Sequence, residues 1–134
     1  MADLEKSILA FSETGVDVHI TELDLSVLPS PWNRSGAEIS DRAAYMESMN
    51  PYKDALPDSA SQALNDRYAE LFGLFLKHED KIKRVTTWGL ADQHSWKNGW
   101  PIPGRTDYPL LFNRDFQPKP VVEEIMKMAA ETEE

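Results

Sequence analysis

Two acidic residues, Glu22 and Asp24, lie two positions apart near the end of a stretch that is rich in β-branched residues. Side chains two apart on a strand point to the same face, and a rise of about 3.3 Å per residue separates them by roughly 7 Å. In parallel α/β folds, groups that bind ligands gather at the carboxyl ends of the strands, where both residues are expected. The pair is therefore a candidate for catalysis by carboxylates. The alternative is a solvated strand end with two unrelated acids.

Three tryptophans, Trp88, Trp96 and Trp100, lie at and after the end of a second apolar stretch, and Trp96 and Trp100 lie among glycine, proline and polar residues. An indole ring has an apolar face and one N–H donor, which suits the C–H face of a sugar ring. The cluster therefore predicts a ligand groove, although the rings would also serve to fill a loop-rich surface. For Trp88 taken alone, packing in the core is the simpler expectation.

The remaining polar candidates in the later part of the chain give weaker signals. His94 is a candidate ligand contact, whereas Arg105 would either donate to a ligand or tie its loop to Asp107, with the structural role favoured. We expect His78 to be a solvated residue at a helix end, where the helix dipole favours it. The histidines lack the spacing of a metal site, and no phosphate-binding glycine loop or serine elbow occurs. We therefore expect no metal and no cofactor.

The composition narrows the class of protein further. The chain has 134 residues with 41% hydrophobic content, which suits one domain or part of a larger one and is too rich for a disordered chain. A formal net charge of −9 argues against binding to nucleic acid or to an anionic membrane surface. The absence of cysteine excludes a disulfide scaffold, a zinc–thiolate site and a cysteine nucleophile. The first residues resemble no secretion signal, and no apolar run approaches the roughly 20 residues of a membrane-spanning helix.

The elements that position these residues alternate between helices and strands. Apolar residues at helical spacing predict helices over residues 4–11, from Asp58 or Ser59 as N-cap to 75, and from 118–120 to 129. Stretches rich in β-branched residues predict strands over residues 16–25 and 82–88. A short helix within 40–49 is expected in the first of two long loops, which cover residues 26–57 and 89–110.

Alternation of this kind is typical of parallel β/α units. Two strands are too few for a stable parallel sheet, so we expect the fold to be incomplete. Either other strands come from another chain, or the sequence is a piece of a larger barrel. Simple alternation along the first strand places His19 and Thr21 towards the outer helix layer, where apolar residues belong. Only a β-bulge that shifts the phase would remove this conflict.

Three separated motifs occur in a fixed order along the chain. They are Gly15-Val-Asp-Val-His-Ile-Thr-Glu-Leu-Asp-Leu25, the residues 87–92 and 95–96 with Pro109-Leu-Leu-Phe112, and Gln117-Pro-Lys-Pro120. Together they resemble the later part of glycoside hydrolase family 10, the endo-1,4-β-xylanases. The resemblance covers nearly the whole chain but only the end of the family's catalytic domain.

This resemblance implies an α/β fold, a partial (β/α)8 TIM barrel. Residues 1–134 would be a C-terminal fragment of the catalytic domain that contains helix 6, strand 7, helix 7, strand 8 and helix 8. Residues 26–57 would be the long loop after strand 7. Strands 1 to 6 of the family's barrel have no counterpart in the sequence.

The resemblance also implies roles for the residues that match the motifs. Glu22 matches the catalytic nucleophile and Asp24 the carboxylate of its supporting hydrogen-bond network, while Trp88 and Trp96 match the rings that wall the sugar site. Further candidates for substrate binding are His94, Trp100 and Arg105.

Two parts of the family's catalytic machinery have no match. The acid/base glutamate belongs to a Trp-…-Asn-Glu motif that the sequence lacks. The histidine that orients the nucleophile comes from strand 6, and His19 should not be given that role.

The function implied is that of a retaining endo-1,4-β-xylanase that hydrolyses β-1,4-xylosidic bonds of xylan, with the isolated chain inactive or very feeble. Its partners would be xylan or xylo-oligosaccharides, together with the missing barrel strands, supplied by another chain or by self-association. The alternatives are a self-associating partial barrel and a non-catalytic xylan-binding module built on the tryptophans. The family implies an extracellular or periplasmic location.

Overall fold

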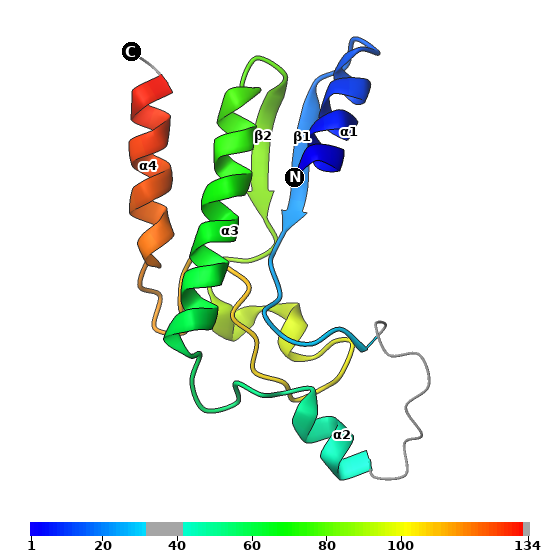
Figure 1. Ribbon diagram of the computed structural model, residues 1–134, viewed down its shortest axis with the longest axis vertical. Coiled ribbons are helices and arrows are strands. Elements are labelled where there is room, and N and C mark those ends of the chain that lie inside the picture. Colours follow the sequence, from blue (N-terminus) through cyan, green and yellow to red (C-terminus); the bar gives the residue numbers. More distant parts are fainter. Residues whose placement is uncertain (32–41, 133–134) are drawn as a thin grey trace.

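The computed structural model describes residues 1–31 and 42–132. In chain order the elements are α1 (Ala2–Ser12), β1 (Val18–Leu23), α2 (Arg42–Ser48), α3 (Asp58–Lys77), β2 (Ile82–Thr87) and α4 (Pro120–Thr132). The strands pair in parallel as a two-stranded sheet, with α1, α3 and α4 running alongside, whereas α2 and the described parts of the long loops lie beyond the carboxyl ends of the strands (Figure 1). None of the described helices is long and apolar enough to cross a membrane.

Each predicted element is present, but several boundaries differ. β1 is shorter than the stretch 16–25, so Asp24 lies just beyond the end of the strand. α3 begins at Asp58 without a side-chain cap, so the predicted N-cap at Asp58 or Ser59 is wrong. Instead Pro57 is extended, and its carbonyl accepts the first helical hydrogen bond, from the amide of Ser61 at 2.9 Å. The short helix predicted within 40–49 is confirmed as α2.

Two apolar clusters fill the space between the sheet and the helices. Their buried members are Ile8, Leu71, Phe75 and Ile82 in the first cluster and Leu64, Tyr68 and Val121 in the second. Tyr68 also donates a hydrogen bond to the carbonyl of Pro109, which ties α3 to the loop after β2. Burial, followed by the charges of Asp24 and Asp92, raises the pKa of Tyr68, so its hydroxyl remains a donor.

A β-bulge in β1 resolves the conflict in the predicted alternation. Ile20 pairs with Val85 and Leu23 with Thr87, so three steps along β1 match two along β2. The phase shift allows apolar residues on both sides of the bulge, including Ile20 and Leu23, to pack against the helix layer. His19 is exposed, and the expectation from simple alternation that it faces the helices is wrong.

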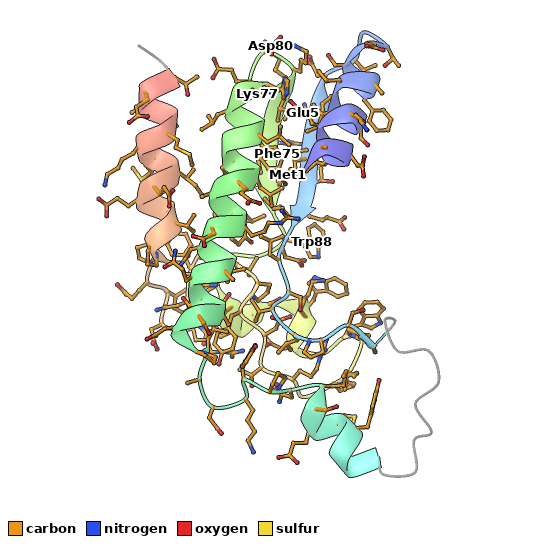
Figure 2. The ribbon with its side chains drawn as sticks, viewed as in Figure 1. Met1, Glu5, Phe75, Lys77, Asp80 and Trp88 are labelled. Carbon is orange, nitrogen blue, oxygen red and sulfur yellow. The ribbon has the colours of Figure 1, made fainter. Side chains whose placement is uncertain are left out.

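His78 is buried rather than solvated, and its partner explains why. Its Nε2 lies 2.8 Å from Glu5 Oε1, and Lys77 Nζ lies 2.7 Å from the same oxygen. Figure 2 shows Glu5 of α1 beside Lys77 near the end of α3. Hydrogen bonds from Lys77 and then His78 hold the pKa of Glu5 below its ordinary value. The sequence missed this contact because α1 and the end of α3 are more than 70 residues apart.

We expect the contact between α1 and α3 to open in acid. Because the folded chain lowers the pKa of Glu5 from 4.5, the contact stabilises the fold above that pH and is lost as the pH falls through the lowered pKa. An NMR titration of the Glu5 carboxyl should have a midpoint below 4.5. Amide protection of α1 should fall over the same range, and Glu5→Gln should remove that pH dependence. Equal protection of α1 at about pH 3 and about pH 6 would contradict the prediction.

Candidate functional site

Glu22 lies at the bulge, one residue before the end of β1. Its backbone φ is +57°, a left-handed conformation that is uncommon outside glycine. Bulges frequently re-aim a side chain next to an active site. The Glu22 side chain is exposed, and among the described residues no hydrogen bond or ion pair engages its carboxylate. The bulge therefore presents a carboxylate with both oxygens open to a ligand.

The backbone conformation of Glu22 predicts an unusual order of stability between two variants. We expect Glu22→Gly to be more stable than Glu22→Ala by about 1 kcal/mol, because only glycine adopts a left-handed conformation at no steric cost. Unfolding in urea measures the difference. The same two substitutions at Thr86, an exposed residue of β2, should give the opposite order, since glycine weakens an ordinary strand. An alanine variant at position 22 as stable as the glycine variant would contradict the strain.

Asp24 has surroundings unlike those of Glu22. Its carboxylate accepts a hydrogen bond from Trp96 Nε1 at 2.8 Å, and Lys97 Nζ lies 3.3 Å from its other oxygen. The side chain is only 8% exposed. The sequence could only place the two carboxylates on one face. In the structure they differ, because Glu22 is open to solvent and Asp24 is held by the loop after β2.

The tryptophans gather beyond the carboxyl ends of the two strands. The amide of Trp88 donates to the carbonyl of Leu23 at 3.0 Å, which continues the parallel ladder and places Trp88 next to the bulge (Figure 2). Trp96 and Trp100 stack with ring centroids 5.2 Å apart and planes at 23°. All three rings are about half exposed, so the expectation that Trp88 packs in the core is wrong. Trp88 thus offers a flat apolar face next to the bulge that carries Glu22, and Trp96 offers one next to Asp24.

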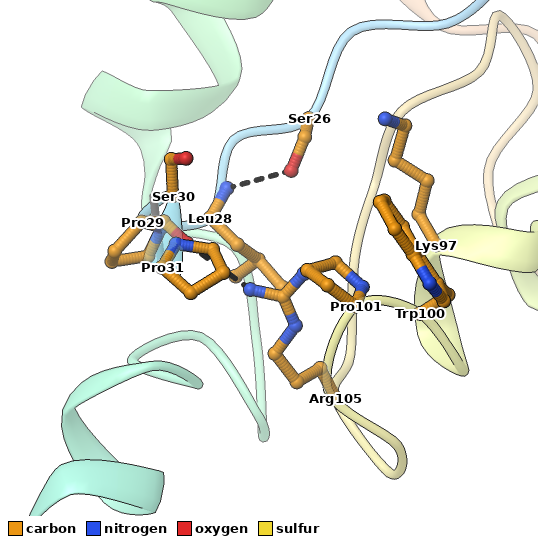
Figure 3. A pocket seen from close by; sticks show the side chains of 9 residues that line it. All are labelled: Ser26, Leu28, Pro29, Ser30, Pro31, Lys97, Trp100, Pro101 and Arg105. Carbon is orange, nitrogen blue, oxygen red and sulfur yellow. Dashed lines mark hydrogen bonds between the residues drawn. The ribbon is translucent and has the colours of Figure 1, made fainter. Parts of the chain in front are cut away.

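A pocket of about 200 Å³ lies between the two long loops, with Lys97 next to Trp100 on one side and Pro29 and Pro31 on the other (Figure 3). Arg105 lines it but is buried, and its Nη1 donates to the carbonyl of Pro29 at 3.1 Å. Arg105 thus fastens the loop after β2 to the loop after β1, and Pro29 takes the place of the expected partner Asp107.

Asp107 is held inside its loop, whereas His94 lies at the surface. Asp107 is fully buried and accepts hydrogen bonds from Ser26 Oγ and from the amides of Val27 and Tyr108. His94 is exposed, and its ring packs against Phe116 at a centroid distance of 5.7 Å. Its role as a ligand contact remains a prediction.

A buried ion pair, which could not be predicted from the sequence, supports the loop that carries Trp96 and Trp100. Lys119 Nζ lies 3.0 Å from Asp92 Oδ2 and also donates to the carbonyls of Tyr108 and Leu110. The side chain of Asp92 is 0% exposed. Burial raises the pKa of Asp92 and lowers that of Lys119, and the partner's charge opposes each shift.

Asn98 links this ion pair to the turn of Trp96. Its Nδ2 donates to the carbonyls of Asp92 and Ser95, and its Oδ1 accepts from the amide of Asp107. The short 3₁₀ turn Trp96–Asn98 is therefore held on a polar scaffold rather than on an apolar core.

Lys97 is a further residue of the site that could not be singled out from the sequence. The available signal was its place directly after Trp96, in the loop that follows β2. Within the described ranges no group of three or more histidine, cysteine or acidic side chains has the arrangement of a metal site.

Comparisons with known proteins find relatives over nearly the whole chain. The sequence profile of Glycosyl hydrolase family 10 matches residues 1–128. Endo-1,4-beta-xylanase A of Xylanibacter ruminicola is 48% identical over 128 residues, which are 96% of this chain and 35% of that protein. Endo-1,4-beta-xylanase A of Caldicellulosiruptor saccharolyticus is 32% identical over 127 residues, which are 95% of this chain and 32% of that protein.

Solved structures give the same picture. A GH10 endoxylanase retrieved from a sugarcane soil metagenome superposes with a TM-score of 0.82 at 41% identity, over 96% of this chain and 35% of that one. A mutant protein in complex with xylotriose superposes with a TM-score of 0.74 at 30% identity, over 93% of this chain and 33% of that one. The chain thus spans about a third of the length of the relatives that it matches.

Proposed function

This chain belongs to glycosyl hydrolase family 10, and from that premise we propose that it is the nucleophile-bearing part of a retaining endo-1,4-β-xylanase. The observation that carries the proposal is the open Glu22 carboxylate, which a bulge presents at the carboxyl end of β1 beside Trp88. In (β/α)8 barrels the ligand binds at the carboxyl ends of the strands, which is where Glu22 lies. The substrate would be xylan or a xylo-oligosaccharide, in keeping with the xylotriose bound to one structural relative.

The family's (β/α)8 barrel gives the two strands their context. We assign β1 and β2 to strands 7 and 8, α1, α3 and α4 to helices 6, 7 and 8, and residues 26–57 to the loop after strand 7. The parallel pairing of β1 with β2 supports this order, because consecutive barrel strands are neighbours. Residues 32–41 of that loop lie outside the described residues.

A retaining glycosidase needs two carboxyl groups about 5–5.5 Å apart across the scissile bond. In the proposed reaction Glu22 attacks the anomeric carbon and forms a glycosyl-enzyme, while a second carboxylic acid protonates the leaving oxygen. That acid then acts as a base and activates the water that releases the sugar. Trp88 and Trp96 would wall the sugar that is attacked, with Trp100, His94 and Arg105 as further candidates for substrate contact.

Asp24 is a poor candidate for the second carboxyl group. One of its oxygens accepts the Trp96 indole N–H and the other faces Lys97, so neither is free to protonate a leaving group. We therefore propose that the acid/base glutamate belongs to another strand of the barrel. General acid–base catalysis contributes roughly 10²–10⁴-fold, so residues 1–134 by themselves should hydrolyse xylan very slowly.

A chimera tests the proposal. Residues 1–128 replace the matching third of the Xylanibacter ruminicola xylanase, and release of reducing sugar from xylan is measured for the chimera and for the chain alone. We expect the chimera to exceed the chain by at least about a hundredfold. Glu13→Gln, which changes an exposed carboxylate after α1, is the matched control and should keep the activity. A folded chimera without activity would overturn the proposal.

The sheet edges favour a second candidate, a partial barrel that associates with itself. A two-stranded parallel sheet leaves strand edges that a further copy can pair with. Light scattering decides this: a stable dimer or higher oligomer of residues 1–134 supports self-association, and a monomer contradicts it.

The half-exposed tryptophans favour a third candidate, a xylan-binding module without catalysis. Retention of the chain on insoluble xylan that survives Glu22→Gln but disappears in Trp96→Ala, with no activity in the chimera, would support this reading. An extracellular or periplasmic location suits each candidate, because polymeric xylan lies outside cells.

A further inference from the structure

Lys97 makes two contacts that converge on the Trp96 ring. Its ammonium lies 3.3 Å from the Asp24 oxygen next to the one that accepts the Trp96 indole N–H. The same ammonium lies 4.8 Å from the centroid of the Trp96 ring. Lys97, Asp24 and Trp96 therefore form a closed set in which each member touches the other two.

The backbone fixes this set from the β2 side. Ser95 Oγ accepts a hydrogen bond from the amide of Lys97 and caps the 3₁₀ turn. Trp96 and Lys97 are consecutive in that short turn, and their side chains reach the two oxygens of the same carboxylate. The side chain of Lys97 is 21% exposed, so solvent screens its charge only in part.

The Trp96 ring needs this support because few other contacts hold its orientation. It is 43% exposed and stacks on Trp100, a ring that is itself half exposed. An exposed indole without a hydrogen bond would sample several rotamers, and a sugar that stacks on it would have to select one of them. The Asp24 carboxylate fixes the ring through its N–H, and the carboxylate is in turn held by Lys97.

We propose that Lys97 is a positioning residue, which holds the Trp96 ring in the orientation that binds the sugar by anchoring the Asp24 carboxylate that accepts the indole N–H. Lys97 itself does not need to touch the substrate. The inference rests on the proposed function for the sugar, whereas the contact among the three side chains is independent of it.

The first test uses the chain without any sugar. In the ¹⁵N-labelled chain the indole N–H signal of Trp96 is identified with Trp96→Phe. Lys97→Met should shift or broaden this signal, Lys97→Arg should restore it, and Lys6→Met, which changes an exposed lysine of α1, should leave it unchanged. If Lys97→Met does not fold, Lys97→Gln replaces it, and the same change of the Trp96 signal is expected. A Trp96 signal that is the same in folded Lys97→Met and wild type overturns the proposal.

The second test measures the affinity of the chimera for xylohexaose. We expect Lys97→Met to weaken the binding of xylohexaose about fivefold, which is the loss expected when one contact between a cation and an aromatic ring is removed. Lys97→Arg should restore the affinity. Lys97→Met should add little to Asp24→Asn, because both act on the same ring. Fully additive losses would overturn the proposal. A chimera that binds no xylohexaose would count against the proposed function alone, since the indole signal tests Lys97 without sugar.

Discussion

Replacing Glu22 by Gln is expected to abolish covalent labelling by an activated 2-fluoro xylobioside. The good leaving group of this reagent needs little acid assistance, so the label depends on the nucleophile rather than on the acid/base group. Intact-mass spectrometry of the chimera should show the addition of one glycosyl unit for the wild type and none for Glu22→Gln. Glu13→Gln, with its exposed carboxylate elsewhere, should be labelled like the wild type.

The same experiment on residues 1–134 alone separates two states of the site. Labelling of the chain would mean that the two strands and their loops already assemble a sugar site and present Glu22. Labelling of the chimera only would mean that Glu22 needs the other strands to bind the sugar. A label that persists in Glu22→Gln, or that maps to another residue, would contradict the assignment of Glu22 as the nucleophile.

Lys119→Met is expected to cost about 3–5 kcal/mol of stability, because it leaves the Asp92 carboxylate buried without a compensating charge. Such a loss corresponds to a drop of roughly 11–18 °C in the melting temperature of a chain of this size. Thermal unfolding followed by circular dichroism measures it. The deficit should shrink as the pH falls towards the range where carboxyl groups protonate, because burial raises the pKa of Asp92 and its neutral form needs no cation.

Two variants control this prediction. Lys127→Met breaks an exposed ion pair with Glu123 on α4 and should leave the melting temperature unchanged. Asp92→Asn in the Lys119→Met background removes the unpaired charge and should recover part of the loss. If Lys119→Met melts at the same temperature as Lys127→Met, the buried ion pair does not support the loop after β2.

The α3 helix and the β1 strand show how far local patterns reach. The apolar residues of α3 recur at helical spacing over five turns, so its existence could be predicted from the sequence. Its start could not, because Pro57 supplies the extended residue and the first carbonyl without any side-chain cap. In β1 the β-branched residues predict a strand, but the bulge depends on how the strand pairs with β2, more than 60 residues later.

The candidate site divides in the same way. Residue types and spacing identified Glu22, Asp24 and the tryptophans, and the family resemblance is confirmed, whereas the catalytic and binding roles of these residues remain predictions. The open carboxylate of Glu22 and the held carboxylate of Asp24 could not be distinguished, because both are acids two positions apart. Their difference comes from Trp96 and Lys97, which reach Asp24 from the other loop.

The sequence by itself determined the order of helices and strands, the family and the chemical groups at the carboxyl ends of the strands. The elements follow from short-range periodicity, the chemical groups from the residue types, and the family from the resemblance of three motifs in a fixed order. Only the tertiary structure decided the partners: Glu5 for His78, Lys119 for Asp92, and Lys97 for Asp24. A charged group becomes stable in a buried position only beside a suitable partner, and the packing of distant segments decides which partner is within reach.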